Sequence, residues 1–206
     1  PDLVPYLPLG FLADFTQDEH VYSIFGSLGW NVTDRLKLTA GLRQSWVHKE
    51  SQGGTFFGTG TQTFGGFVPQ PAVGQIAGFL VGAEGQSERL SRTDDALMPS
   101  ASVQYQVLPE AMVYLSYSRG FKAGGFNGQT PLSPPSVVSF GPEHVDAYEL
   151  GLKTKWFDDR LLLNLALFRS DYTDLQVSTQ VYRPELDIYT VELRNAAESR
   201  SVGAEL

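Results

Sequence analysis

The chain has 206 residues, no cysteine and a formal net charge of −8, so it lacks disulfides, thiol chemistry and a basic stripe for nucleic acid. No segment approaches the roughly 20 apolar residues of a membrane-spanning helix, which excludes a helical membrane protein. The 21 glycines and the aromatic content of 12% indicate an all-β chain.

Alternating side chains mark the strands. In residues 112–126, Val113, Leu115 and Tyr117 fall on one parity, and small or polar residues fall on the other. Successive side chains of a β-strand point to opposite faces, so one face here is apolar and the other polar. The pattern recurs in six further stretches, residues 21–32, 36–46, 96–107, 143–156, 161–177 and 202–206. Seven strands are therefore expected.

The connections alternate strictly between short and long. Short polar turns are expected at 33–35, 108–110 and 157–160. Residues 1–18 are expected to be irregular, because Pro5 and Pro8 break any ladder. Long loops are expected at about 50–95, 123–142 and 179–190. In an up-and-down antiparallel sheet, alternate connections lie at the same rim, so the short turns gather at one rim and the long loops at the other.

This asymmetry is typical of outer-membrane barrels, in which the long loops are extracellular. Trp30 and Trp156 adjoin short turns, as an interfacial aromatic belt requires. Lys37 and Lys153 lie opposite the leucines, where they face a lumen without the roughly 2–4 kcal/mol cost of a charge at the lipid midplane. Arg119 is an exception with the apolar parity, which we explain by snorkelling or a bulge.

The sequence therefore predicts an all-β, antiparallel up-and-down transmembrane β-barrel segment spanning residues 19–206. Seven strands cannot close a bacterial single-chain barrel, so we expect a fragment with two open edges. At about 30 residues per strand, a 22-stranded plugged transporter needs roughly 650 residues, and this chain would be about a third of its barrel.

Several segments carry a family resemblance: TDRLKLTAGLRQSW, YLSYSRGFKAGGFNG, FGPEHVDAYELGLKTKWFDDRLLLNLALFRSDYTDLQV and NAAESRSVGAEL. In sequence and order they resemble the barrel of TonB-dependent outer-membrane receptors. The resemblance implies active uptake of a ferric siderophore or similar bulky nutrient across the outer membrane of Gram-negative bacteria. Its implied partners are membrane lipid, the plug domain of the same parent chain, the TonB complex and the nutrient. The TonB box and the plug lie outside this sequence.

Six side chains are candidates for binding substrate near the long-loop rim: Lys49, Ser118, Lys122, Phe126, Asn127 and Glu143. The simpler interpretation of residues 120–128 is a strand end with turn-permitting glycines and girdle aromatics. Plug contact or solvation explains Lys49, Ser118 and Glu143 equally well. We expect no cofactor, and the three histidines lack metal-ligand spacing.

Two other classes of function stay open. A passive porin-like or adhesive barrel would share the two-faced wall but lack the plug and the TonB box. A barrel enzyme such as a lipase or protease would need a Ser/His or Asp/His cluster at the loop rim, and the sequence offers none. We therefore do not expect an enzyme.

Overall fold

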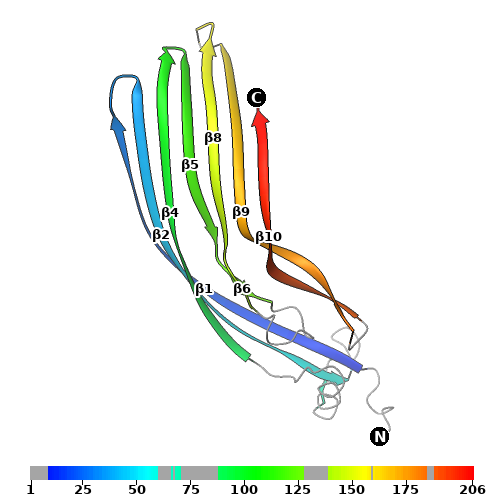
Figure 1. Ribbon diagram of the computed structural model, residues 1–206. Coiled ribbons are helices and arrows are strands. Elements are labelled where there is room, and N and C mark those ends of the chain that lie inside the picture. The colour runs from blue at the N-terminus through cyan, green and yellow to red at the C-terminus, as the bar shows by residue number, and fades with distance from the viewer. Residues whose placement is uncertain are drawn as a thin grey trace.

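The computed structural model describes residues 9–59, 66, 68–70, 88–127, 139–158, 160–184 and 188–206. Most of these residues belong to one antiparallel sheet, seen in Figure 1 as long, curved, neighbouring strands. The strands are β1 (Leu9–Asn31), β2 (Leu36–Thr59), β3 (Val68–Pro69), β4 (Glu88–Leu108), β5 (Ala111–Lys122), β6 (Gly125–Phe126), β7 (Ser139–Phe140), β8 (Glu143–Trp156), β9 (Leu161–Arg183) and β10 (Ile188–Glu205).

Seven long strands follow chain order across the sheet, β1-β2-β4-β5-β8-β9-β10. The short β3 pairs with β2, and β6 and β7 form a separate two-stranded sheet. All-β architecture and seven long antiparallel strands are thus confirmed. None of the described residues belongs to a helix long and apolar enough to cross a membrane.

The three predicted short turns are confirmed, and they lie at one end of the sheet (Figure 1). In the β1–β2 turn, the backbone amides of Arg35 and Leu36 donate to Thr33 Oγ1 at 3.2 and 3.0 Å. In the β8–β9 turn, between the register partners Trp156 and Leu161, Phe157 and Asp158 lie in the left-handed region with φ of 56° and 55°. The opposite ends of these strands lie at the other end of the sheet, which we call the loop rim (Figure 1).

The sheet has almost no apolar core. Val47, Ala96 and Ala111 are the only buried hydrophobic residues among those described, whereas Leu115 and Leu150 are 54% and 51% exposed. A water-soluble sheet would hide the leucine face against another layer. An outward apolar face is instead satisfied by lipid, as in membrane barrels.

On the polar inner face, two rings lie over glycines of neighbouring strands. A Cβ on Gly151 would come within 2.2 Å of the Tyr114 ring, and one on Gly203 within 2.5 Å of the Phe168 ring. Both pairs are direct register partners. Each glycine therefore provides the space in which the aromatic ring of its partner lies.

Several expected strand limits were wrong at the loop rim. β1 begins at Leu9 within the segment expected to be irregular, β2 runs on to Thr59, and β4 begins at Glu88. β9 runs to Arg183 and β10 begins at Ile188, so both strands extend into the loop expected at 179–190. Beyond the membrane both faces of a strand meet water, so the ladder continues after the apolar alternation has ended. The middle of the expected 50–95 loop lies outside the described residues, apart from residues 66 and 68–70.

Arg119 keeps its place on the outward face. It pairs with Asp146 in an unbroken β5–β8 register, so no bulge turns its side chain inward.

Candidate functional site

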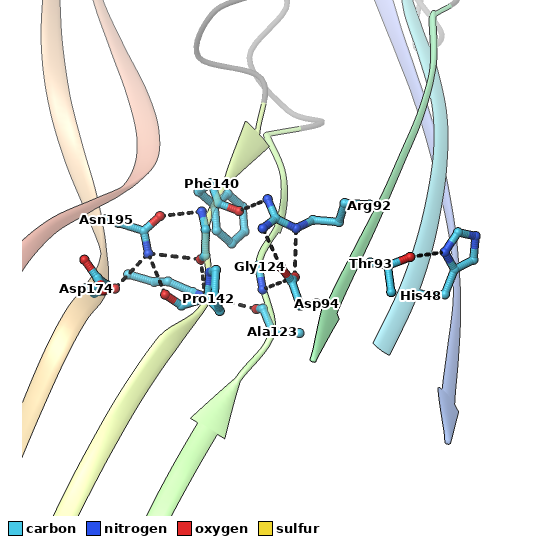
Figure 2. A network of polar contacts seen from close by, with 12 residues as sticks. His48, Arg92, Thr93, Asp94, Ala123, Gly124, Phe140, Pro142, Asp174 and Asn195 are labelled. Atoms are coloured by element: carbon cyan, nitrogen blue, oxygen red, sulfur yellow. Dashed lines mark hydrogen bonds and ion pairs between the residues drawn. The ribbon is translucent and has the colours of Figure 1, made fainter. Parts of the chain in front are cut away.

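The loop rim contains a break in the main sheet. β5 and β8 have 12 and 14 residues, while β4 and β9 have 21 and 23. Beyond Lys122 and Glu143 the ladder between β4 and β9 is missing, and the β6–β7 hairpin lies at this position (Figure 2).

An arginine–carboxylate pair joins β4 to this hairpin. Arg92 binds Asp94 through two parallel contacts, Nε to Oδ2 at 2.7 Å and Nη2 to Oδ1 at 2.6 Å. Arg92 Nη1 also donates to the carbonyl of Phe140 at 2.6 Å, and the amide of Gly124 donates to Asp94 Oδ2 at 2.9 Å (Figure 2). The Asp94 side chain is only 7% exposed, so its charge depends on these donors.

Asn195 joins the opposite side of the hairpin to β9 and β10. Its Nδ2 donates to the carbonyls of Gly141, Pro142 and Asp174 at 3.0, 3.2 and 2.7 Å, and its Oδ1 accepts from the amide of Gly141 (Figure 2). Asp174 is in the left-handed region with φ of 54°, and β10 has register shifts on either side of Ala197. Asn195 therefore holds the point at which the β9–β10 ladder becomes irregular.

Gln176 of β9 completes this arrangement. Its Nε2 donates to the carbonyls of Ala123 and Gly141, both at 3.0 Å. The backbone N–H of Gln176 donates to Glu143 Oε2 at 3.0 Å. We call these bonds the rim network; its side-chain members are Arg92, Asp94, Glu143, Gln176 and Asn195.

Four of the six candidate residues lie in or beside the rim network. Glu143 is a member, and Phe126 pairs with Ser139 in the β6–β7 hairpin. Asn127 exchanges two 2.9 Å bonds with the backbone of Leu193 in β10. Lys122 is exposed and is the register partner of Glu143.

The other two candidates lie apart. Lys49 forms a cross-strand ion pair with Glu19 at 3.4 Å on the inner face. Ser118 is exposed on the inner face, between its register partners Ser100 and Ala147. Contacts among the described residues link neither side chain to the hairpin.

Sequence reasoning singled out none of Arg92, Asp94, Gln176 and Asn195 as site residues. The signal available for Asn195 was its place at the head of the NAAESRSVGAEL segment. Its four hydrogen bonds reach the backbone of three residues, Gly141, Pro142 and Asp174. No spacing rule in the sequence connects these residues with Asn195. The network can brace a loop, and its two carboxylates, Asp94 and Glu143, accept hydrogen bonds within it. No three described His, Cys, Asp or Glu residues are grouped to hold a metal.

The protein-family model described as TonB-dependent receptor-like, β-barrel matches residues 2–206 of this chain. The chain belongs to this family. Members of the TonB-dependent receptor family are outer-membrane proteins of Gram-negative bacteria, and the predicted location is thereby confirmed.

Sequence relatives among these receptors are distant. The chain is 25% identical over 203 residues to the pesticin receptor of Yersinia pestis. It is 29% identical over 123 residues to the probable TonB-dependent receptor BfrD of Bordetella pertussis, 58% of this chain and 15% of that protein. The pesticin receptor match covers 98% of this chain but only 25% of the relative, so the chain spans about a quarter of it.

Solved receptors share the fold. The ferric yersiniabactin uptake receptor FyuA from Yersinia pestis matches with a TM-score of 0.66 at 19% identity, over 94% of this chain and 24% of that chain. The siderophore receptor PiuA from Acinetobacter baumannii matches with a TM-score of 0.62 at 17% identity, over 93% and 23%. Both likenesses concern the arrangement of strands in the barrel wall.

Proposed function

We propose that this chain is a section of the barrel wall of a receptor that takes up a ferric siderophore or a similarly bulky nutrient with energy supplied through TonB. The observation that carries the proposal is a wall built for lipid outside and water inside, in a chain matched over residues 2–206 by the receptor barrel model. Support for the nutrient class comes from relatives whose names denote a pesticin receptor and a ferric yersiniabactin uptake receptor.

In this proposal the wall takes part by position and does no covalent chemistry. The long loops at the loop rim capture the nutrient on the extracellular side. The plug domain of the same parent chain fills the lumen, and TonB acts on the parent from the other side of the membrane. Lys122, Phe126 and Asn127 contact the nutrient, because the rim network holds their segment at the mouth. Lys49 and Ser118 face the lumen and contact either the nutrient or the plug.

The test is uptake by cells that carry the full-length parent receptor, with a panel of radiolabelled ferric siderophores and with or without functional TonB. We expect uptake of at least one ferric siderophore, and we expect it to vanish without TonB. Unchanged uptake without TonB, together with flux of small unrelated solutes, would contradict the proposal and favour a passive barrel.

The rim residues can be tested in the same assay. Phe126→Ala is expected to raise the KM for the transported siderophore about tenfold while leaving the maximal rate within about twofold, since an aromatic anchor in a binding site contributes on the order of 1–2 kcal/mol. Phe157→Ala, at an exposed position of the β8–β9 turn at the end of the sheet away from the loop rim, is the matched control and should leave the KM unchanged. A KM unchanged by Phe126→Ala would remove Phe126 from the site.

A further inference from the structure

A row of charged residues crosses the outward face of four neighbouring strands. Arg119 of β5, Asp146 of β8, Asp171 of β9 and Arg200 of β10 are register partners in turn. Register partners in an antiparallel sheet project to the same face. Leu150 lies an even number of residues from Asp146 along β8, so its side chain is on this face too. The charges therefore share the lipid-facing side of the wall.

The row lies where the apolar band ends. Its neighbouring row, on the side of the short turns, contains Tyr117 and Tyr148, whose ring centroids are 5.2 Å apart, and then Arg169. Tyrosines of this kind mark the level of lipid headgroups in membrane proteins. The three arginines thus lie at the headgroup level of the leaflet nearest the loop rim.

The hydrogen bonds among these charged side chains do not use all the N–H donors of the arginines. Asp171 serves two arginines: Oδ2 binds Arg169 Nε and Nη2, both at 2.8 Å, and Oδ1 binds Arg200 Nε at 2.5 Å. Asp146 Oδ1 accepts the hydroxyl of Tyr117 at 2.7 Å.

Arg119 is exposed and has no hydrogen bond or ion pair with any part of the chain that the structure describes. Each guanidinium carries five N–H donors, so three of them exceed what two occupied carboxylates can accept.

We propose that Arg119, Arg169 and Arg200 bind the phosphate of a membrane lipid headgroup beside the loop rim. The guanidinium fork matches a phosphate in charge and geometry, and its weak hydration favours binding at a partly apolar surface. Neighbouring strands are about 4.8 Å apart, so the row from β5 to β10 spans about 14 Å, and the long arginine side chains can converge on one phosphate from both sides. The site is independent of the nutrient carried and adds a lipid contact to the wall.

The experiment uses the full-length parent receptor in neutral detergent, with lipid retention measured by native mass spectrometry. The probes are phosphatidic acid and diacylglycerol of the same chain length, which differ only in the phosphate. We expect the receptor to retain phosphatidic acid in preference to diacylglycerol. Arg119→Gln should weaken that retention about fivefold, the contribution of one basic residue near an anionic lipid. Asp171→Asn should strengthen it, because two arginines are released from their shared carboxylate.

The control variant is Arg43→Gln, whose side chain lies on the inner face and binds Ser23 and Ser45. It should retain phosphatidic acid like the unmodified receptor, and the folded state of every variant is checked by the mobility of the unboiled barrel on electrophoresis. Equal retention of the two lipids would overturn the proposal, as would weaker retention in folded Asp171→Asn. Displacement of phosphatidic acid by equimolar inorganic phosphate would also overturn it, because it would assign the arginines to a free anion.

Discussion

At the scale of single residues, the side chain of Asn195 makes four hydrogen bonds, the most of any member of the rim network. Asn195→Ala removes one acceptor and the donors to three carbonyls. We expect it to destabilise the β7–β8 junction by about 2–3 kcal/mol, since each net bond contributes about 1 kcal/mol and some carbonyls will find water. Hydrogen exchange of the Gly141 amide in the full-length receptor should accelerate, and the exposed Asn164→Ala provides the control. An unchanged exchange rate would contradict the bracing role.

Gly151 is a second residue whose effect can be predicted. Any Cβ at this position collides with the ring of Tyr114, which also donates to Glu149 Oε1 at 2.5 Å and therefore resists displacement. Gly151→Ala is expected to lower the stability of the refolded receptor by about 1–3 kcal/mol, as overpacking does. Denaturant titration measures this loss. Gly26→Ala is the control, because no atom lies within 4 Å of a Cβ at that position, and equal losses in the two variants would contradict the ring contact.

At the scale of the strands, the two faces predict opposite tolerance to charge. Leu38→Arg or Leu150→Arg places a cation on the lipid side and should impair membrane insertion by about 2–4 kcal/mol. Lys37→Leu or Lys153→Leu should be much milder, because these side chains face the lumen and Lys153 loses only a contact of 5.4 Å to the Tyr114 ring. Refolding yields into vesicles measure both sets, and similar yields would reverse the facing assignment.

The strands within the membrane were predictable from sequence, because lipid and lumen impose opposite demands on alternate residues. Leu150 faces lipid and Lys153 faces the lumen, as their positions in the alternating pattern predict. The strand ends were not predictable, since the extension of β2 to Thr59 depends on ladder bonds with β1 and not on side-chain polarity. The rim network was beyond sequence reasoning for a related reason: Arg92 and Phe140 are 48 positions apart, and only the fold brings them together.

At the scale of the whole molecule, the described sheet ends in β1 on one side and β10 on the other, and neither has a further partner among the described strands. The 206-residue chain expressed alone is therefore expected to self-associate in water through its apolar face and both edges. Detergent should cover the face but leave the edges open. Size-exclusion chromatography with light scattering would measure this, and a stable monomer in detergent would contradict the expectation.

The two rings that lie over glycines also bear on how neighbouring strands find their alignment during assembly. A slip by one residue exchanges the faces and is rejected by lipid, but a slip by two residues keeps every side chain on its own face. Such a slip would bring Tyr114 opposite Glu149 or Lys153 in place of Gly151, where a side chain occupies the space of the ring. These pairs thus discriminate against the misalignment that the membrane itself cannot detect.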